Sequence, residues 1–319
     1  MIFFLFSQLN YPIGYNFVSF SQGIRSMAMG EAFTAVSDDA TGIFYNISGF
    51  SFLEGFDSKI AIYDIYNQLA ILSFGVAFPV KNFGFGFGMS LWGDEQQRYD
   101  EYGEHTGTFS NTEILSAAGF SVKPLNYFSF GIGAKYLYSA FDKYTANGML
   151  WDAGMLYVPN QFLKFGISIQ NLGFPRKFIT LYEYPPARLR TGGAFFFPIL
   201  NVGRFIYSID LIGYPYRVDI GTGFEIAIYI PDFVRDFIEA NMSGIRIWAG
   251  FNTKGYSFRE HFFYGLGVIY AIDNNFYMSI EGIYTDNFYL GESMRFGISL
   301  YYHPSHSKKK TKKGSIKRK

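Results

Sequence analysis

The adjacent acids Asp38 and Asp39 are the first candidates for chemistry, because two neighbouring carboxylates can bind a cation or share a proton. A metal ion needs several converging oxygens, and no others are visible nearby in the sequence. Carboxylates of this kind also cap short helices and form salt bridges. We therefore expect this pair to stabilise structure, and we predict neither a metal site nor a cofactor.

Nucleophilic catalysis has little support in the sequence. A hydrolase requires a Ser or Thr positioned by a His, and no His lies within a predicted strand. The chain has no Cys, which excludes a thiol nucleophile and a disulfide. The run at 84–88 (GFGFG) lacks the strand-then-helix context of a phosphate loop. We predict that the protein is not an enzyme. The histidines, in predicted loops or after the last strand, are His105, His261, His303 and His306.

A set of charged residues of mixed sign lies on the less apolar faces of the predicted strands. Such charges could line a polar permeation path or form ion pairs that brace the interior. Unpaired buried charges are costly, which favours the ion pairs. The set is Lys135, Asp152, Lys164, Arg190, Asp219, Glu225, Arg246, Glu281 and Arg295.

These charges are positioned by segments in which apolar residues alternate with Gly, Ser and single charges. In residues 83–91, Phe and other apolar side chains occupy one face, and Gly and Ser occupy the other. The pattern predicts fourteen strands. Their ranges are 56–66, 68–79, 82–92, 111–122, 127–139, 147–158, 162–171, 188–197, 203–213, 217–230, 244–252, 262–271, 274–285 and 292–302.

Composition and loop lengths favour a transmembrane barrel over a soluble β-sandwich. Aromatic residues make up 21 % of the chain, and no apolar run reaches the roughly 18 residues of a membrane helix. Connections after even-numbered strands are short, whereas those at 93–110, 172–187 and 253–261 are long and polar, as in outer-membrane barrels. The exception is 231–243, whose spacing predicts a small helix. We predict a closed antiparallel transmembrane β-barrel with an N-terminal lumen plug.

Four regions follow from this pattern. Residues 1–20 are a possible signal remnant and lead, residues 21–52 a plug or hatch, residues 53–303 the barrel, and residues 304–319 a disordered basic tail. Eight of the 27 basic residues lie in the last twelve positions. The other 19 face 26 acids, a net charge of −7, which argues against nucleic-acid binding.

Two motifs point to a known family. The first follows the pattern G-x-R-x-x-x-M-G-x-A-F-x-A-V-x-D-D-A, then N-x-x-G, and resembles the N-terminal signature of the PorV/PorQ family, whose relatives include FadL-type transporters. Ile47 stands where the family has Pro. The matching residues are Gly23, Arg25, Met29, Gly30, Ala32, Phe33, Ala35, Val36, Asp38, Asp39, Ala40, Asn46 and Gly49. The second motif is Gln170, Asn171, Leu172 and Gly173.

The resemblance implies a fourteen-stranded bacterial outer-membrane barrel with an N-terminal hatch in its lumen. Our hypothesis is that Arg25, Asp38, Asp39 and Asn46 hold or gate this hatch, with Arg25 and the two acids docking onto the inward charges. A FadL-like role predicts passive passage of a hydrophobic or amphipathic small molecule, captured at 93–110 and 172–187.

Two alternatives remain open at this stage. One is a PorV-like shuttle that binds exported proteins in a secretion system, and the other is a structural envelope barrel without transport. All three roles, namely channel, shuttle and structural barrel, imply contact with membrane lipid and with the outer-membrane assembly machinery.

Overall fold

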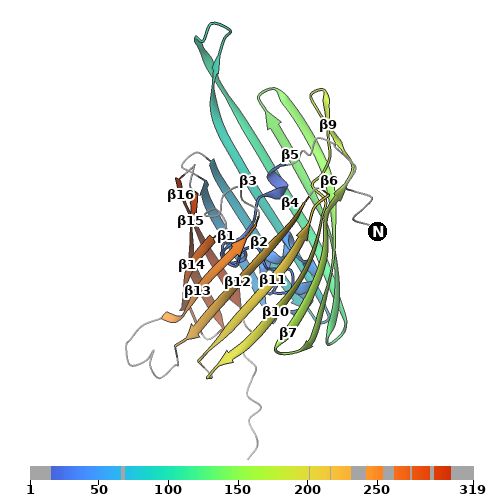
Figure 1. Cartoon of the computed structure of the whole chain (residues 1–319), viewed down its shortest axis with the longest axis vertical. Coiled ribbons are helices and arrows are strands. Elements are labelled where there is room, and N and C mark those ends of the chain that lie inside the picture. Colours follow the sequence, from blue (N-terminus) through green and yellow to red (C-terminus); the bar gives the residue numbers. More distant parts are fainter. Residues whose placement is uncertain are drawn as a thin grey trace, which may run out of the picture.

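The computed structural model describes residues 16–65, 69–200, 202–215, 217–230, 242–253, 262–273, 275–287 and 291–302. Fourteen antiparallel strands form a closed barrel, in which β1 pairs with β16 and β7 pairs with β10 (Figure 1). Two short strands, β8 (Arg176–Phe178) and β9 (Leu181–Glu183), make a separate hairpin. The predicted fold class, a closed fourteen-stranded antiparallel barrel, is confirmed.

The barrel strands follow chain order around the wall. They are β1 (Phe56–Ile65), β2 (Leu69–Val80), β3 (Phe83–Tyr99), β4 (His105–Leu125), β5 (Phe128–Phe141), β6 (Tyr144–Asn160), β7 (Leu163–Gly173), β10 (Arg188–Ile199), β11 (Gly203–Gly213), β12 (Val218–Tyr229), β13 (Met242–Asn252), β14 (Phe262–Ala271), β15 (Phe276–Asn287) and β16 (Gly291–Tyr302). We call the end with the tight turns at 81–82, 126–127 and 161–162 the turn end, and the opposite end the loop end.

Two connections predicted as loops contain strand. Residues 94–99 and 105–110 continue β3 and β4 beyond their pairing with β2 and β5, and we call this projecting pair the ribbon. Within the ribbon, the backbone N–H and C=O groups of β3 and β4 form hydrogen bonds with each other. The polar side chains of the ribbon allow it to project beyond the barrel. His105 therefore begins β4 instead of lying in a loop. The connection 172–187 contains the β8–β9 hairpin.

Several sequence predictions fall outside the described residues. These are the first fifteen residues of the possible signal remnant, the basic tail, His261, His303, His306 and residues 231–241 of the predicted helix. The last two residues of that predicted helix, Met242 and Ser243, belong to β13, in which Met242 pairs with Tyr270 of β14 and Ser243 lies at a bulge. No helix among the described residues is long and apolar enough to span a membrane.

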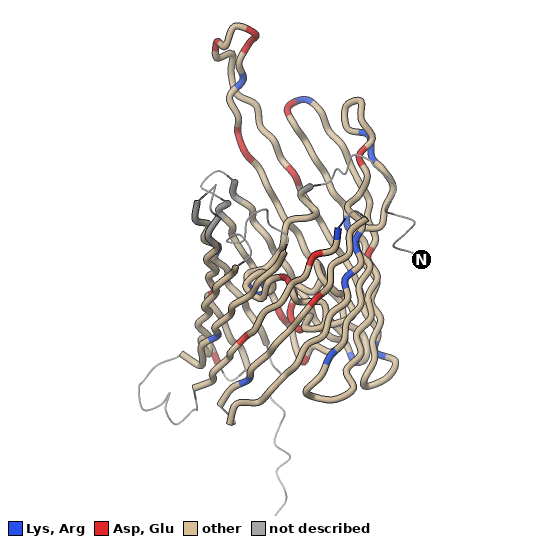
Figure 2. The backbone as a smooth tube through the Cα atoms, in the orientation of Figure 1, with Lys and Arg blue, Asp and Glu red and all other residues tan. Residues whose placement is uncertain are grey.

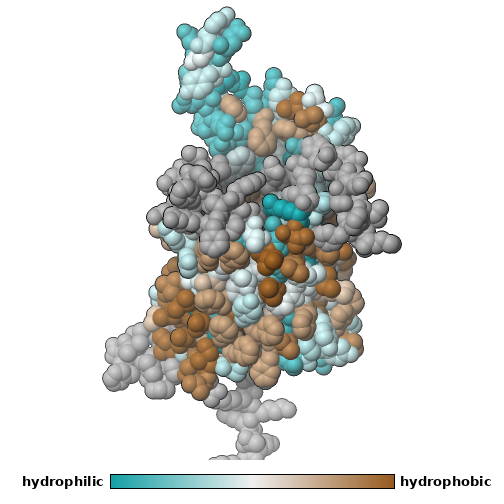
Figure 3. Space-filling model, in the orientation of Figure 1, coloured by the Kyte–Doolittle hydropathy of each residue, from teal (hydrophilic) through white to brown (hydrophobic). Residues whose placement is uncertain are grey.

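Alternation along the strands separates an apolar outer surface from a polar interior. Along β6, buried and exposed residues alternate from Ala146 to Tyr157. Phe83, Phe85 and Phe87 are exposed on the outside, and Figure 3 shows hydrophobic side chains gathered on the barrel wall. Charged residues concentrate inside the barrel and on the ribbon, whose tip is acidic (Figure 2). This is the pattern of a barrel wall that faces hydrocarbon.

Residues 17–52 lie inside the barrel, and we call them the N-terminal segment (Figure 1). The chain folds there into η1 (Asn16–Ser19), α2 (Ile24–Ala28), η2 (Ala40–Phe44) and η3 (Ile47–Phe52). Asp39 caps η2 by accepting from the Thr41 backbone N–H at 2.9 Å, and Asn46 caps η3 by accepting from Ser48 at 3.3 Å. Because polar side chains cap these short helical turns, backbone N–H groups at their starts have hydrogen-bond partners inside the barrel.

Inward-facing glycines let the wall approach the backbone of the N-terminal segment. A Cβ added at Gly223 would lie 2.4 Å from the Met29 carbonyl oxygen, and one at Gly131 would lie 2.5 Å from the Ser48 nitrogen. Any side chain at these positions would collide with backbone, which cannot rotate away. The alternating Gly face of the strands is therefore the surface on which the segment packs.

The assignment of the outer face predicts a large difference between two arginine substitutions. Ile132 in β5 is 53 % exposed on the outer wall, so Ile132→Arg would place a charge in hydrocarbon and destabilise the barrel by about 2–4 kcal/mol. Thr108→Arg on the exposed ribbon should change stability by less than about 0.5 kcal/mol. Urea unfolding in lipid vesicles measures both. Equal losses would contradict the assigned faces.

Candidate functional site

Arg25 is the central ion of the barrel interior. From α2 its guanidinium donates to Asp38, to Asp39 at 3.1 Å and to Glu225 of β12 at 2.5 Å. The side chain is fully buried and also lies over the Phe33 ring, 5.3 Å from its centroid. A buried guanidinium with three carboxylate partners ties the N-terminal segment to the barrel wall.

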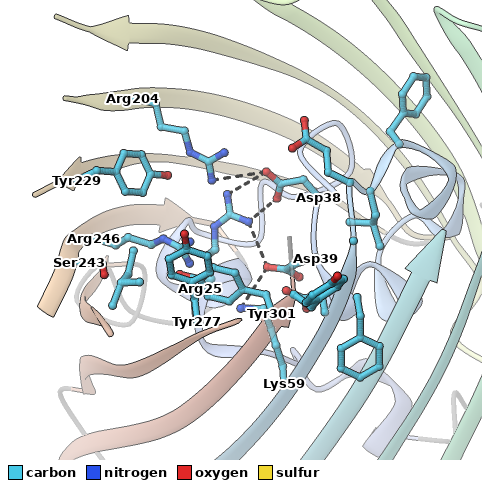
Figure 4. A pocket seen from close by; sticks show the side chains of 18 of the residues that line it. Arg25, Asp38, Asp39, Lys59, Arg204, Tyr229, Ser243, Arg246, Tyr277 and Tyr301 are labelled. Carbon is cyan, nitrogen blue, oxygen red and sulfur yellow. Dashed lines mark hydrogen bonds and ion pairs between the residues drawn. The ribbon is translucent and has the colours of Figure 1, made fainter. Parts of the chain in front are cut away.

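The two acids extend this network to both sides (Figure 4). Asp38 lies 3.8 Å from Arg204 of β11, and Asp39 lies 3.5 Å from Lys59 of β1. Burial raises the pKa of Asp38, but the positive charges of Arg25 and Arg204 outweigh it and hold this pKa well below its ordinary value. Asp38 is thus ionised, and both acids are engaged in ion pairs.

The wall completes the same network through inward-facing residues. Glu225 also accepts from Arg204 at 3.1 Å and from the Trp248 indole N–H at 2.7 Å. Glu281 lies 3.4 Å from Lys59 and 3.8 Å from Arg246. Each of these carboxylates meets at least two donors, as burial of a charge demands.

A second cluster anchors the middle of the N-terminal segment. Asp210 of β11 accepts from the backbone N–H groups of Phe33 and Thr34 at 3.2 and 3.0 Å and from the Thr34 hydroxyl at 2.5 Å. Arg190 lies 3.3 Å from Asp210 and donates to the Thr34 hydroxyl and the Glu31 carbonyl. Arg190 and Asp210 are both fully buried, so this contact is shielded from water.

The motif at 170–173 forms a third cluster, at the loop end of β7. Gln170 donates to the carbonyls of Phe44 and Tyr45 at 2.9 and 2.6 Å. Asn171 has a left-handed φ of 58° and accepts from Lys135 at 2.9 Å, while Lys135 pairs with Asp152 at 2.6 Å.

The other two motif residues do not join this interior network. Leu172 faces outward, and a Cβ at Gly173 would meet the Met149 carbonyl at 2.5 Å.

The remaining candidates occupy separate positions. Asn46 donates to the carbonyls of Thr34 and Met155 at 2.8 and 3.1 Å, which links the segment to β6. Lys164 lies over the Phe196 ring at 4.6 Å, Asp219 lies 3.2 Å from Arg217 near the loop end, and Arg295 lies over the Tyr63 ring at 5.6 Å. Asp219 therefore lies away from the network around Arg25.

Several interior residues were not among the sequence candidates: Lys59, Arg188, Arg204 and Asp210. Lys59 and Arg204 alternate with apolar neighbours in their strands just as the named charges do, and strand periodicity applied to every charge would have found them. Among the described residues, no group of three or more His, Cys, Asp or Glu side chains is arranged to hold a metal ion.

A cavity of about 590 Å³ lies on the turn-end side of the N-terminal segment. Its lining includes the start of β1 at Phe56, the end of β12 at Tyr229 and the end of β16 at Tyr301. Arg25, Asp38 and Asp39 form its floor, and Arg204, Arg246 and Lys59 project from the wall around them (Figure 4). Charged groups and aromatic rings thus share one enclosed space.

Comparison with known proteins identifies the fold. No protein-family model matches the sequence, and neither does any curated protein. Solved structures do: the Pseudomonas putida toluene transporter TodX matches with a TM-score of 0.60 and 11 % identity over 90 % of this chain and 99 % of TodX.

Two further structures agree with this match. The Ralstonia pickettii toluene transporter TbuX gives a TM-score of 0.55 at 10 % identity, over 88 % of this chain and 97 % of TbuX. A Pseudomonas aeruginosa FadL homologue gives 0.51 at 11 % identity, with the same coverages. The chain has the FadL-like barrel fold.

Removal of the central guanidinium should destabilise the protein strongly. Arg25→Ala leaves Asp38, Asp39 and Glu225 without a shared partner in a buried site, with an expected loss of about 3–5 kcal/mol. Arg98→Ala breaks the exposed pair with Asp142 and should cost no more than about 1 kcal/mol. Denaturant unfolding compares them, and similar losses would show that the interior network is dispensable.

A single methyl group should loosen the N-terminal segment. Gly223→Ala places a Cβ against the Met29 backbone and should make residues 21–52 more sensitive to limited proteolysis. A packing cost of about 1.4 kcal/mol corresponds to a cleavage rate about tenfold higher. Gly193→Ala is the control, because its Cβ would meet only the Phe165 ring at 3.8 Å. Unchanged cleavage of both variants would refute close packing at Gly223.

Proposed function

We propose that this protein is an outer-membrane channel for small hydrophobic molecules. The observation that supports it most is a closed barrel with an apolar outer wall and an occupied interior. That architecture is shared with proteins described as toluene transporters and a monoaromatic hydrocarbon channel. An aromatic-rich wall would hold the barrel in a bacterial outer membrane, with the short turns on the periplasmic side.

The N-terminal segment is proposed as the plug of this channel. Its polar contacts reach around the wall, from Lys59 on β1 through Gln170 on β7 to Glu225 on β12. In this proposal Arg25, Asp38, Asp39 and Asn46 hold the plug, and passage requires part of it to move.

Capture of the hydrophobic molecule is proposed at the β8–β9 hairpin. Phe174 is 81 % exposed and Leu181 is 67 % exposed, and Tyr182 beside them is also exposed. Arg176 fixes the hairpin over the loop end by pairing with Glu183 at 2.9 Å and donating to Ser139 of β5 at 2.8 Å. An apolar patch held by buried polar contacts suits capture of apolar solutes better than the polar ribbon does.

Uptake of radiolabelled toluene by cells tests this function, because an intact lipopolysaccharide leaflet slows the entry of hydrophobic solutes. Expression of the protein should raise uptake several-fold, and Phe174→Ser combined with Leu181→Ser should remove most of the gain. Tyr102→Ser, at the exposed tip of the ribbon, is the control and should leave uptake unchanged. Uptake equal to that of cells without the protein would refute the proposal.

The motif resemblance to PorV/PorQ proteins, and with it a role in binding exported proteins, stays a prediction. Recovery of secreted protein cargo with the purified barrel would support it. The fold neighbours are channels and transporters, so we propose no enzymatic activity.

A further inference from the structure

The N-terminal segment fills the barrel unevenly. Within it, η3 packs against β2 to β6, and α2 packs against β13 to β16. The turn-end cavity is left beneath them, and its lining draws on β7, β10, β11, β12 and β13 as well as β1. Its volume of about 590 Å³ is within the range of small-molecule sites, roughly 300–1,000 Å³.

Three cations on β7, β11 and β13 have N–H groups that the ion-pair network of the described residues does not use. Lys164 lies over the Phe196 ring, and no described carboxylate lies within ion-pair distance of it. Arg204 bonds Glu225 through Nε and Nη2 but is 33 % exposed, and its Nη1 has no partner among the described residues. Arg246 contacts Glu281 only at 3.8 Å, and its buried Nε has no hydrogen-bond partner among the described residues.

The neighbouring carboxylates, by contrast, are occupied or lie elsewhere. Asp38, Asp39, Glu225 and Glu281 each accept from at least two cationic groups. Two further acids line the cavity: Glu54, which precedes β1, and Asp57, which accepts from the Ala40 backbone N–H at 2.7 Å. Lys164, Arg204 and Arg246 therefore present N–H groups to the cavity that the described carboxylates do not occupy, and an anion could accept from them.

Aromatic rings line the space beside these donors. Tyr277 and Tyr301 stack with centroids 5.3 Å apart and planes 11° apart, and Arg246 lies over Tyr301 at 5.6 Å. Tyr229, 39 % exposed, lies between Arg204 and Arg246 in Figure 4. Flat rings next to guanidinium groups suit a flat ligand that carries negative charge.

We propose that this cavity binds small aromatic carboxylates on the turn-end side of the N-terminal segment. The carboxylate would accept from Lys164, Arg204 and Arg246, and the ring would pack against Tyr229 and the Tyr277–Tyr301 pair. This inference rests on the proposed channel function and extends it, because the site would take charged aromatic acids as well as neutral molecules. An aromatic acid would be held here before release from the turn end.

Calorimetry with benzoate tests the proposal on the full chain in lipid nanodiscs, with benzyl alcohol as the neutral probe of the same shape. Benzoate should bind more tightly than benzyl alcohol, and its affinity should fall with rising salt. Lys164→Gln and Arg204→Gln should each weaken benzoate binding about tenfold, or about 1.4 kcal/mol, without changing benzyl alcohol binding. Lys164→Arg should retain most of the affinity.

Controls separate binding from folding and from transport. Lys164→Gln breaks no ion pair with a described residue, so its unfolding should match that of the unmodified protein even if Arg204→Gln is less stable. Arg98→Gln, on the ribbon, should bind benzoate normally. No benzoate binding, binding unaffected by both Gln substitutions, or binding of octanoate but not benzoate would each overturn the proposal. Normal toluene uptake in that case would leave the channel function standing, and lost uptake with intact benzoate binding would refute only the channel function.

Discussion

Closure of the sheet is the constraint on which the rest of the structure depends. A strand in hydrocarbon cannot leave its backbone N–H and C=O groups unpaired, so the first and last strands must meet. They do so over most of β1, from Phe56, opposite Tyr302, to Tyr63, opposite Arg295. Once the sheet is closed, the number of strands sets the diameter of the barrel, and the side chains of each strand alternate between its outer surface and its interior.

Closure at fourteen strands creates an interior too wide for wall side chains to fill. The N-terminal segment occupies that space, and the wall adapts to it in two ways. Glycines such as Gly131 and Gly223 admit its backbone, and charged residues such as Glu225 and Asp210 bond to it. The polar face of the strands is thus a packing surface for another part of the same chain and not a lining for water alone.

The interior charges are balanced locally rather than spread along an open path. Arg25, Arg190 and Lys135 each sit in a different cluster with carboxylates at hydrogen-bonding distance. Towards the turn end, Lys164, Arg204 and Arg246 keep N–H groups that the described carboxylates do not occupy, at the cavity that carries our second proposal. Apolar groups, in contrast, gather at the loop end on the β8–β9 hairpin, so the two ends of the barrel offer different chemistry.

The sequence by itself determined the strands and the outer face, because side-chain alternation is a local property with a period of two. All fourteen barrel strands were predicted. The extensions of β3 and β4 and the β8–β9 hairpin were missed, and other strand ends, such as the start of β6 at Tyr144, differ by a few residues. The acid pair Asp38–Asp39 and its partner Arg25 were also recognisable as a unit. The tertiary structure alone decided which wall residues meet them.

Glu225 and Arg25 are 200 positions apart, and Lys59 reaches Asp39 only because the N-terminal segment folds back beside β1. No local pattern encodes such distances, so the sequence could not show which inward charges meet the N-terminal segment, and Asp219 was grouped with residues it does not meet. The cavity arises in the same way, from an uneven fit between a segment and a wall whose relative placement is set by closure of the barrel.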